Sequence, residues 1–178
     1  MAVTLDDALL RRQLQAAIHG DDIALGSLVR ATQPIVWRFC ASLSSRQEAD
    51  DIAQEVFLRA TRNLSQFRGE ASVVSWLLSI ARHVCADHVR RNQRRTRLAM
   101  RLRGERVPTW QSHTHIDLDS LLDGLDPDRK TAFVMTQVIG LSYEEAAAAC
   151  ECPVGTIRSR VARARNDLVT AVRAAEAL

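Results

Sequence analysis

The sequence predicts an all-α protein, and two observations lead to this prediction. Apolar residues recur at helical spacing along most of the chain, and no segment shows the alternating pattern of a half-buried strand. The 178 residues include only 7 glycines and 4 prolines, which leaves room for long uninterrupted helices. Because 47% of the residues are hydrophobic and 25% are charged, the chain has the composition of a folded protein, and we expect two small helical domains.

The helices expected in the first half follow from their capping and breaking residues. Asp6 and Asp21 are good N-caps, Gly20 ends the first helix, and Pro34 is expected to separate the second helix from a third. A turn then precedes a long fourth helix, and a loop leads into a fifth helix that continues into an arginine-rich segment. We predict helices over residues 6–19, 21–33, 34–43, 47–63 and from about 72 onward, in a first domain of residues 1–100.

A linker and a second helical domain are expected to follow. Gly104, Pro108 and mixed polar residues interrupt the helical pattern over residues 101–116, which we predict to be the linker. Ser142 and Glu145 can form a capping box, and a break at residues 152–155 gives the last two helices the layout of a helix-turn-helix. Helices are expected over residues 117–122, 126–139, 142–150 and from 154 to the end, in a second domain of residues 117–178.

Charge is distributed unevenly along the chain. The net charge is only +3, yet residues 90–106 hold eight arginines and one glutamate, whereas residues 107–128 hold five aspartates and no base. Lys130 is the only lysine, so nearly all basic charge is arginine, which favours bidentate contacts to phosphate or guanine. This pattern indicates a polyanion as partner of the basic segment.

The last predicted helix combines a buried stripe with a basic outer face. The stripe repeats at helical spacing through Ile157, Val161, Ala164 and Leu168. The outer face suits entry into the DNA major groove, where arginine can pair with guanine and serine with phosphate, and it carries Arg158, Ser159, Ala162 and Arg163. A solvated helix in a bundle is the alternative, but four arginines and no acid over residues 158–165 argue against it.

The helix over residues 47–63 has the pattern of a protein-docking surface. Its predicted core stripe consists of Ala49, Ile52, Ala53, Val56 and Ala60. The opposite face sets an apolar residue among carboxylates, with Phe57 at its flank, and presents Asp51, Gln54, Glu55 and Leu58. A metal site built from the carboxylates is less favoured, because no histidine stands at the matching spacing.

The fifth helix is predicted to carry a second nucleic-acid surface. Leu77, Ala81, Val84, Cys85 and His88 are expected to face inward. The other side continues into the arginines and suits base stacking and phosphate contacts, and it carries Trp76, Ser79, His83, Asp87 and Arg90. Trp76 could instead be a partly buried anchor for the preceding loop, and the two roles are compatible.

Targeting and metal chemistry are not expected. The N-terminus lacks the pattern of a signal or transit peptide, and no window approaches the roughly 20 apolar residues of a membrane span, so we predict a cytoplasmic protein without membrane insertion. The four cysteines are too few and too irregular for a disulfide framework. A zinc site from Cys150, Cys152, His113 and His115 has the wrong spacing, and we expect no metal or cofactor.

In this order, the motifs resemble the extracytoplasmic-function sigma factors of the bacterial sigma-70 family. Residues 50–60 look like the family's core-polymerase-binding helix, known as region two point two. The segments 67–70, 76–77, 80–82 and 87–91 match the melting and minus-ten regions, and 142–146 with 152–160 is similar to the minus-thirty-five-reading region.

This resemblance implies a promoter-specificity subunit of RNA polymerase that is not itself an enzyme. Asp51, Gln54, Glu55 and Phe57, with Leu58 beside them, would bind the clamp coiled coil of core polymerase, and the second domain would sit on the flap. Promoter DNA, double- and single-stranded, would be the other partner, and an anti-sigma protein is a candidate regulator. The residues implied for the minus-ten element are Phe67, Arg68, Trp76, Ser79, His83, Asp87, Arg90 and Arg91, with His83 standing where many relatives carry asparagine.

Two rival functions are less consistent with the sequence. A stand-alone helix-turn-helix regulator usually binds a palindrome as a dimer, and the acidic docking helix and the tryptophan-bearing helix have no role in it. A metal-dependent nucleic-acid enzyme would need a cluster of carboxylates or histidines that the predicted helix faces do not provide.

Overall fold

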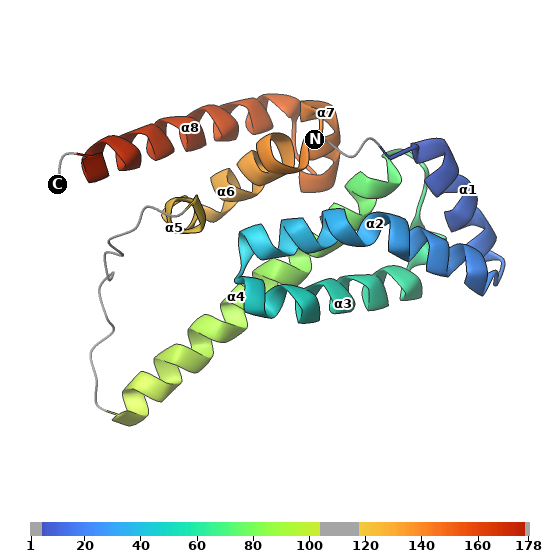
Figure 1. Cartoon of the computed structure of the whole chain (residues 1–178), viewed down its shortest axis with the longest axis horizontal. Helices are drawn as coiled ribbons and strands as arrows, with labels where there is room; N and C mark the ends of the chain where they lie inside the picture. The colour runs from blue at the N-terminus through green and yellow to red at the C-terminus, as the bar shows by residue number, and fades with distance from the viewer. Residues whose placement is uncertain (1–4, 104–117, 177–178) are drawn as a thin grey trace.

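The computed structural model describes residues 5–103 and 118–176, and every regular element in these residues is a helix, as predicted (Figure 1). A first group packs before residue 104 and a second group after residue 117. The first comprises α1 (Asp7–Ile18), α2 (Asp22–Leu43), α3 (Arg46–Arg62), the short η1 (Leu64–Gln66) and α4 (Val73–Arg103). The second comprises α5 (Leu118–Asp123), α6 (Pro127–Phe133), η2 (Val134–Ile139), α7 (Tyr143–Cys150) and α8 (Val154–Glu176).

The core of the first domain lies between α2, α3 and α4, with α1 packed on α2 and α4. All five residues of the predicted α3 stripe are buried, and α4 buries the predicted Leu77, Ala81, Val84 and Cys85 beside them. Phe39 of α2 and Leu14 of α1 are fully buried in the same core. Each such large apolar side chain contributes about 1.5–3 kcal/mol on burial, so the apolar stripes account for the packing of these helices.

Residues 22–43 form the single helix α2, whereas two helices meeting at Pro34 were predicted. Pro34 lies inside α2 and cannot donate a backbone hydrogen bond to the preceding turn. The helix nevertheless continues, because its buried side runs without a break from Leu28 through Val36 to Phe39. Core packing on both sides of the proline therefore outweighs the lost hydrogen bond, and the prediction of a break at Pro34 was wrong.

In the second domain, α6, α7 and α8 pack together and confirm most of the predicted elements. The capping box is present: the Glu145 amide donates to Ser142 Oγ at 3.1 Å, and the Ser142 amide donates to Glu145 Oε2 at 2.9 Å. Ile157, Val161 and Ala164 of the predicted α8 stripe are buried, but Leu168 is only half-buried. The expected helix over 126–139 widens into the π-helical turn η2, which ends at Gly140 with φ 90°.

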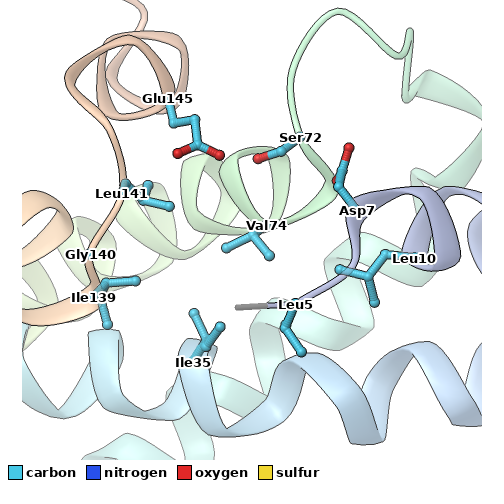
Figure 2. Close-up of a pocket in the computed structure, with 10 residues that line it drawn as sticks. All are labelled: Leu5, Asp7, Leu10, Ile35, Ser72, Val74, Ile139, Gly140, Leu141 and Glu145. Carbon is cyan, nitrogen blue, oxygen red and sulfur yellow. The ribbon is translucent and has the colours of Figure 1, made fainter. Parts of the chain in front are cut away.

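The two domains contact one another, which the sequence did not predict. Helix α7 packs against α4, and η2 packs against α2. A cavity of about 180 Å³ remains at this junction, and Figure 2 shows Leu5, Ile35 and Ile139 around it, with Ser72 and Glu145 pointing toward one another at its rim. Helix α4 extends beyond α2 and α3 at its C-terminal end, toward the lower left of Figure 1.

A polar cluster ties the first turn of α3 to the middle of α4. His88 Nε2 lies 2.9 Å from Glu48 Oε1, and Asn92 Nδ2 and Ser45 Oγ also donate to this carboxylate. His88, which was expected to face inward, therefore lies half-buried at the edge of the core. The hydrogen bond from His88 is the main reason that the pKa of Glu48 is lowered from its usual 4.5, against a smaller opposing effect of desolvation.

This cluster predicts an acid-sensitive part of the stability. Because the pKa of Glu48 is lower in the folded than in the unfolded protein, its stabilisation is complete above the usual pKa of 4.5 and is lost as the pH falls through the folded value. Glu48→Gln should therefore lower the free energy of unfolding at pH 7. The expected loss is about 1 kcal/mol or less, because the carboxylate is 36% exposed. In the variant, the free energy of unfolding should also fall less steeply below pH 4.5 than in wild type. Urea denaturation at pH 7 and pH 4 measures both effects. The exposed control is Glu144→Gln. If wild type, Glu48→Gln and this control lose the same free energy of unfolding between pH 7 and pH 4, the stabilising role assigned to Glu48 is contradicted.

Candidate polymerase and nucleic-acid interfaces

The predicted docking face of α3 borders a groove between α2 and α3. The groove has a volume of about 360 Å³, and its lining includes Gln54, Phe57 and Leu58 from α3 together with Trp37 of α2. The indole Nε1 of Trp37 donates to Asp50 Oδ1 at 2.7 Å, which fixes the ring at one wall. The structure therefore brings three of the five predicted docking residues to one apolar, solvent-facing groove.

The two remaining docking residues lie outside the lining of that groove. Asp51 is exposed on α3, whereas Glu55 accepts a hydrogen bond from Arg59 Nε at 2.7 Å. Arg59 also reaches Asp87 of α4 at 3.5 Å, so one guanidinium joins a predicted docking residue to a predicted minus-ten residue. Sequence reasoning missed this link, although the Glu55–Arg59 spacing of four residues is a known helix-pair signal.

Asp87 is held in its charged form by two arginines. Its pKa is lowered mainly by the hydrogen bond from Arg90 Nη2, at 2.8 Å, and further by Arg59, against an opposing desolvation effect. Arg91 Nε donates to the backbone oxygen of Asp87 at 3.3 Å. Arg90 and Arg91, two of the arginines predicted to contact DNA, are exposed, and their hydrogen bonds to Asp87 position them on the surface of α4.

A pocket lies where the loop before α4 meets the first turns of that helix. The rings of Phe67 and Trp76 meet edge to face, with centroids 5.5 Å apart. Phe67, Arg68, Trp76 and Ser79 all line this pocket of about 200 Å³. Trp76 is half-buried and also borders the space beneath Leu25 and Leu28 of α2, so it anchors the loop while one side remains at the pocket.

His83 lies further along the same face of α4 and is exposed. Its Nδ1 lies 2.9 Å from the Ser79 carbonyl oxygen and its Nε2 lies 3.2 Å from Arg82 Nη2. A carbonyl can only accept, so Nδ1 carries the proton and Nε2 accepts from the arginine in the neutral ring. The imidazole is thus oriented by its own helix and presents an edge to solvent.

Helix α7 covers one side of the pocket that Phe67 and Trp76 line. Ala148 and Glu151 complete its lining, and Glu151 Oε1 lies 3.7 Å from Arg82 Nη2 of α4. DNA that entered this pocket would therefore meet α7. The second domain thus lies against a surface that is predicted to bind promoter DNA.

The basic face of α8 is exposed as predicted. Arg158, Ser159, Ala162 and Arg163 all face solvent. The neighbouring arginines are engaged inside the domain: Arg160 binds Asp128, and Arg165 Nη2 donates to Gln137 Oε1 at 2.7 Å. Of the four arginines over residues 158–165, Arg160 and Arg165 thus bond within the domain, whereas Arg158 and Arg163 face solvent.

The cysteines have the character of packing residues. Cys40 and Cys85 are buried, and their mutual hydrogen bond together with burial raises the pKa of Cys40. Desolvation raises the pKa of Cys150 to about 11. Residues 5–103 and 118–176 contain no group of three or more ligating side chains placed to hold a metal ion, and His113 and His115 lie outside these ranges. No helix within the same ranges has the length and apolar character needed to cross a bilayer.

An apolar groove with carboxylates beside it, an aromatic pocket on a helix with exposed arginines and a basic helix-turn-helix are features of a DNA-binding protein that also docks on another protein. Models of two families match the chain, Sigma-70 region 2 over residues 28–95 and Sigma-70 region 4 over residues 115–168. The chain belongs to the extracytoplasmic-function sigma factors of the sigma-70 family. It is a transcription initiation factor that binds core RNA polymerase and directs promoter recognition.

Relatives and solved structures agree with this assignment. The chain is 42% identical over 173 residues to the probable RNA polymerase sigma-C factor of Mycobacterium bovis, covering 94% of each chain. It is 34% identical over 145 residues to the sigma factor EcfG of Rhodopseudomonas palustris, covering 79% of this chain and 80% of the relative. RpoE of Bartonella quintana, solved with the anti-sigma factor NepR, matches with TM-score 0.65 at 29% identity, covering 83% and 96%. CnrH, solved with the cytosolic domain of CnrY, matches in fold with TM-score 0.71 at 24% identity, covering 95% and 97%.

Proposed function

We propose that this sigma factor divides its work among three surfaces. The α3 face and groove bind core polymerase through Asp51, Gln54, Glu55, Phe57 and Leu58. The loop before α4 and the outer face of α4 bind the minus-ten element through Phe67, Arg68, Trp76, Ser79, His83, Asp87, Arg90 and Arg91. The α8 face binds the minus-thirty-five element through Arg158, Ser159, Ala162 and Arg163. The first domain, residues 1–100, would thus act at the minus-ten element, residues 101–116 would link the domains, and residues 117–178 would act upstream.

The pocket beside Trp76 is the observation that carries the proposal. A planar base can stack on an aromatic ring, and stacking alone accepts any base. Polar groups at the edge of the ring can then select one base by hydrogen bonding. Here Ser79 and Arg68 supply such groups at the lining of the pocket. The exposed arginines further along α4 would contact the phosphates of the strand that leads into this pocket.

The contact between α7 and α4 implies an order of events. The Arg82–Glu151 pair is partly exposed and 3.7 Å long, so it contributes little to holding the domains together. Core polymerase would bind the two domains at separate places, the clamp coiled coil and the flap, and thereby uncover the pocket for DNA. An anti-sigma protein would act in the opposite direction, and the solved complex of the Bartonella relative with its anti-sigma factor supports such a partner.

The chain would contribute recognition rather than chemistry. Its assigned residues form docking and base-stacking surfaces, and phosphodiester synthesis would remain the work of core polymerase. The protein would act in the cytoplasm, where the polymerase and the promoters are.

A change at Trp76 tests the central assignment. Trp76→Ala should leave binding to core polymerase unchanged but slow strand opening, through a loss of stacking worth about 1–3 kcal/mol for one base. Trp76→Phe, which keeps an aromatic ring, should retain most of the activity. Permanganate footprinting of the minus-ten element on a promoter selected from a randomised library measures opening. Equal footprints for wild type and Trp76→Ala would remove the pocket from the proposed mechanism.

A further inference from the structure

Helix α1 carries none of the residues assigned above, yet one of its arginines binds the loop that forms the minus-ten pocket. Arg11 Nη1 donates to the carbonyl oxygen of Gly69 at 2.8 Å, and Nη2 donates to that of Ala71 at 2.6 Å. These two bonds bridge 58 and 60 residues of sequence. Hydrogen bonds from a charged donor are about twice as strong as neutral ones, and a forked pair also fixes orientation.

Asp7 holds that arginine in position and fixes the end of the same loop. Its Oδ2 accepts from Arg11 Nε at 2.6 Å, which orients the guanidinium. Its Oδ1 accepts from the amide of Val73 at 2.8 Å, so the carboxylate caps the first residue of α4. One ion pair of α1 therefore contacts the loop backbone at Gly69, at Ala71 and at the start of α4.

The same guanidinium also contacts the aromatic part of the pocket. Arg11 Cζ lies 5.4 Å from the centre of the Phe67 ring, within the range of a cation–π interaction, and Phe67 in turn meets Trp76 edge to face. Gly69 has φ +76°, and a Cβ at this position would lie 3.2 Å from Arg11 Nη1. The loop is therefore shaped closely around the arginine.

The middle of this loop, residues 68–70, packs no side chain into the core, whereas Phe67 and Ser72 at its two ends contact Trp76 and Ser75. Arg68, Gly69 and Glu70 are exposed residues, so this part of the loop buries no apolar group of its own. The pocket, however, is built largely from this loop, since its lining includes Gln66, Phe67, Arg68, Gly69, Glu70 and Ala71. The bonds from α1 thus hold the exposed middle of the pocket wall.

We propose that Arg11, oriented by Asp7, is a positioning residue of promoter recognition: it holds the loop of residues 67–72 in the shape that receives an unpaired minus-ten base. This inference rests on the proposed function of the pocket. Arg11 is not assigned a contact with DNA, because its guanidinium donors are already directed at the loop and at Asp7.

The test compares Arg11→Ala with Arg12→Ala, which removes the same charge from the next, exposed position of the same helix. The full chain is assembled with core polymerase, and affinity is measured for a single-stranded oligonucleotide that carries the minus-ten element of a selected promoter. Arg11→Ala should weaken this affinity at least tenfold, the scale of one lost charge-assisted hydrogen bond, with Arg12→Ala unchanged. Arg11→Lys, which keeps the charge but loses the fork, should fall between them.

Core binding and thermal unfolding of each variant separate positioning from a general loss of structure. Should Arg11→Ala not fold, Arg11→Lys and Asp7→Asn provide the same comparison. An Arg11→Ala affinity equal to that of Arg12→Ala, or a loss matched by an equal loss of core binding, would overturn the inference. If Trp76→Ala still weakens strand binding in that case, the pocket assignment stands without Arg11. If neither variant changes strand binding, the proposed function of the pocket fails first.

Discussion

A Leu58→Glu variant is expected to lose detectable binding to core RNA polymerase while remaining folded. Leu58 is 47% exposed on α3 and lines the groove between α2 and α3, so the change leaves the core of the domain untouched. On docking, the side chain would be covered, and an unpaired carboxylate there costs several kcal/mol. The free-energy cost of that buried charge makes this the largest effect expected for a single change.

Leu9→Glu is the matched control for this experiment. Leu9 is 45% exposed and lies on α1, away from the α2–α3 groove, so the same substitution tests the general effect of an added charge. Pull-down with core enzyme measures binding, and circular dichroism measures helicity. Asp51→Arg should also impair binding, through reversal of an exposed charge on the same face. A loss of helicity in Leu58→Glu that parallels the loss of binding, or equal pull-down of both leucine variants, would contradict the docking assignment.

The helices and their buried faces could be predicted from sequence because they depend on local signals. Aspartate caps begin α1 and α2, the capping box begins α7, and apolar stripes mark the buried sides of α3 and α8. Such signals act within one or two turns of helix, so a single sequence contains them in full. The exposure of Arg158 and Arg163 followed from the same periodicity.

Features that depend on distant parts of the chain could not be predicted in this way. Pro34 is a strong local breaker, but tertiary burial on both sides of it keeps α2 continuous. The bonds from Arg11 to the loop join residues about sixty positions apart, and no spacing rule connects them. Leu168 fits the helical repeat yet is only half-buried, because burial also depends on how far the neighbouring helices extend along α8.

The contact between the domains matters most among the features that sequence reasoning missed. Ala148 and Glu151 of α7 share the lining of one pocket with Phe67 and Trp76, so the second domain and an unpaired DNA base would occupy adjoining space. The free chain therefore offers less of the surface that we propose for promoter DNA. The weak, exposed ion pair between Arg82 and Glu151 is compatible with separation of the domains when polymerase binds both of them.

The second large effect is expected on the outward face of α8, from combined replacement of Arg158 and Arg163 by alanine. Both side chains are exposed, whereas Arg160 and Arg165 of the same helix are bound to Asp128 and Gln137. Each single change should weaken recognition of the upstream element by about 1–3 kcal/mol if the arginine reads a base edge. A phosphate contact would instead weaken binding uniformly across sequences.

Transcription by holoenzyme from promoters altered only in the minus-thirty-five element distinguishes these two cases. Arg173→Ala is the matched control, because it removes one exposed arginine from the same helix far from the helix-turn-helix. A base contact predicts that the Arg158 and Arg163 variants discriminate less between altered and unaltered promoters than the Arg173 variant does. The double variant should lose most activity at promoters that depend on the upstream element and retain binding to core polymerase. Full activity of the double variant at those promoters would show that this face of α8 does not contact DNA. Promoter recognition would then have to be assigned to α4 and the loop before it.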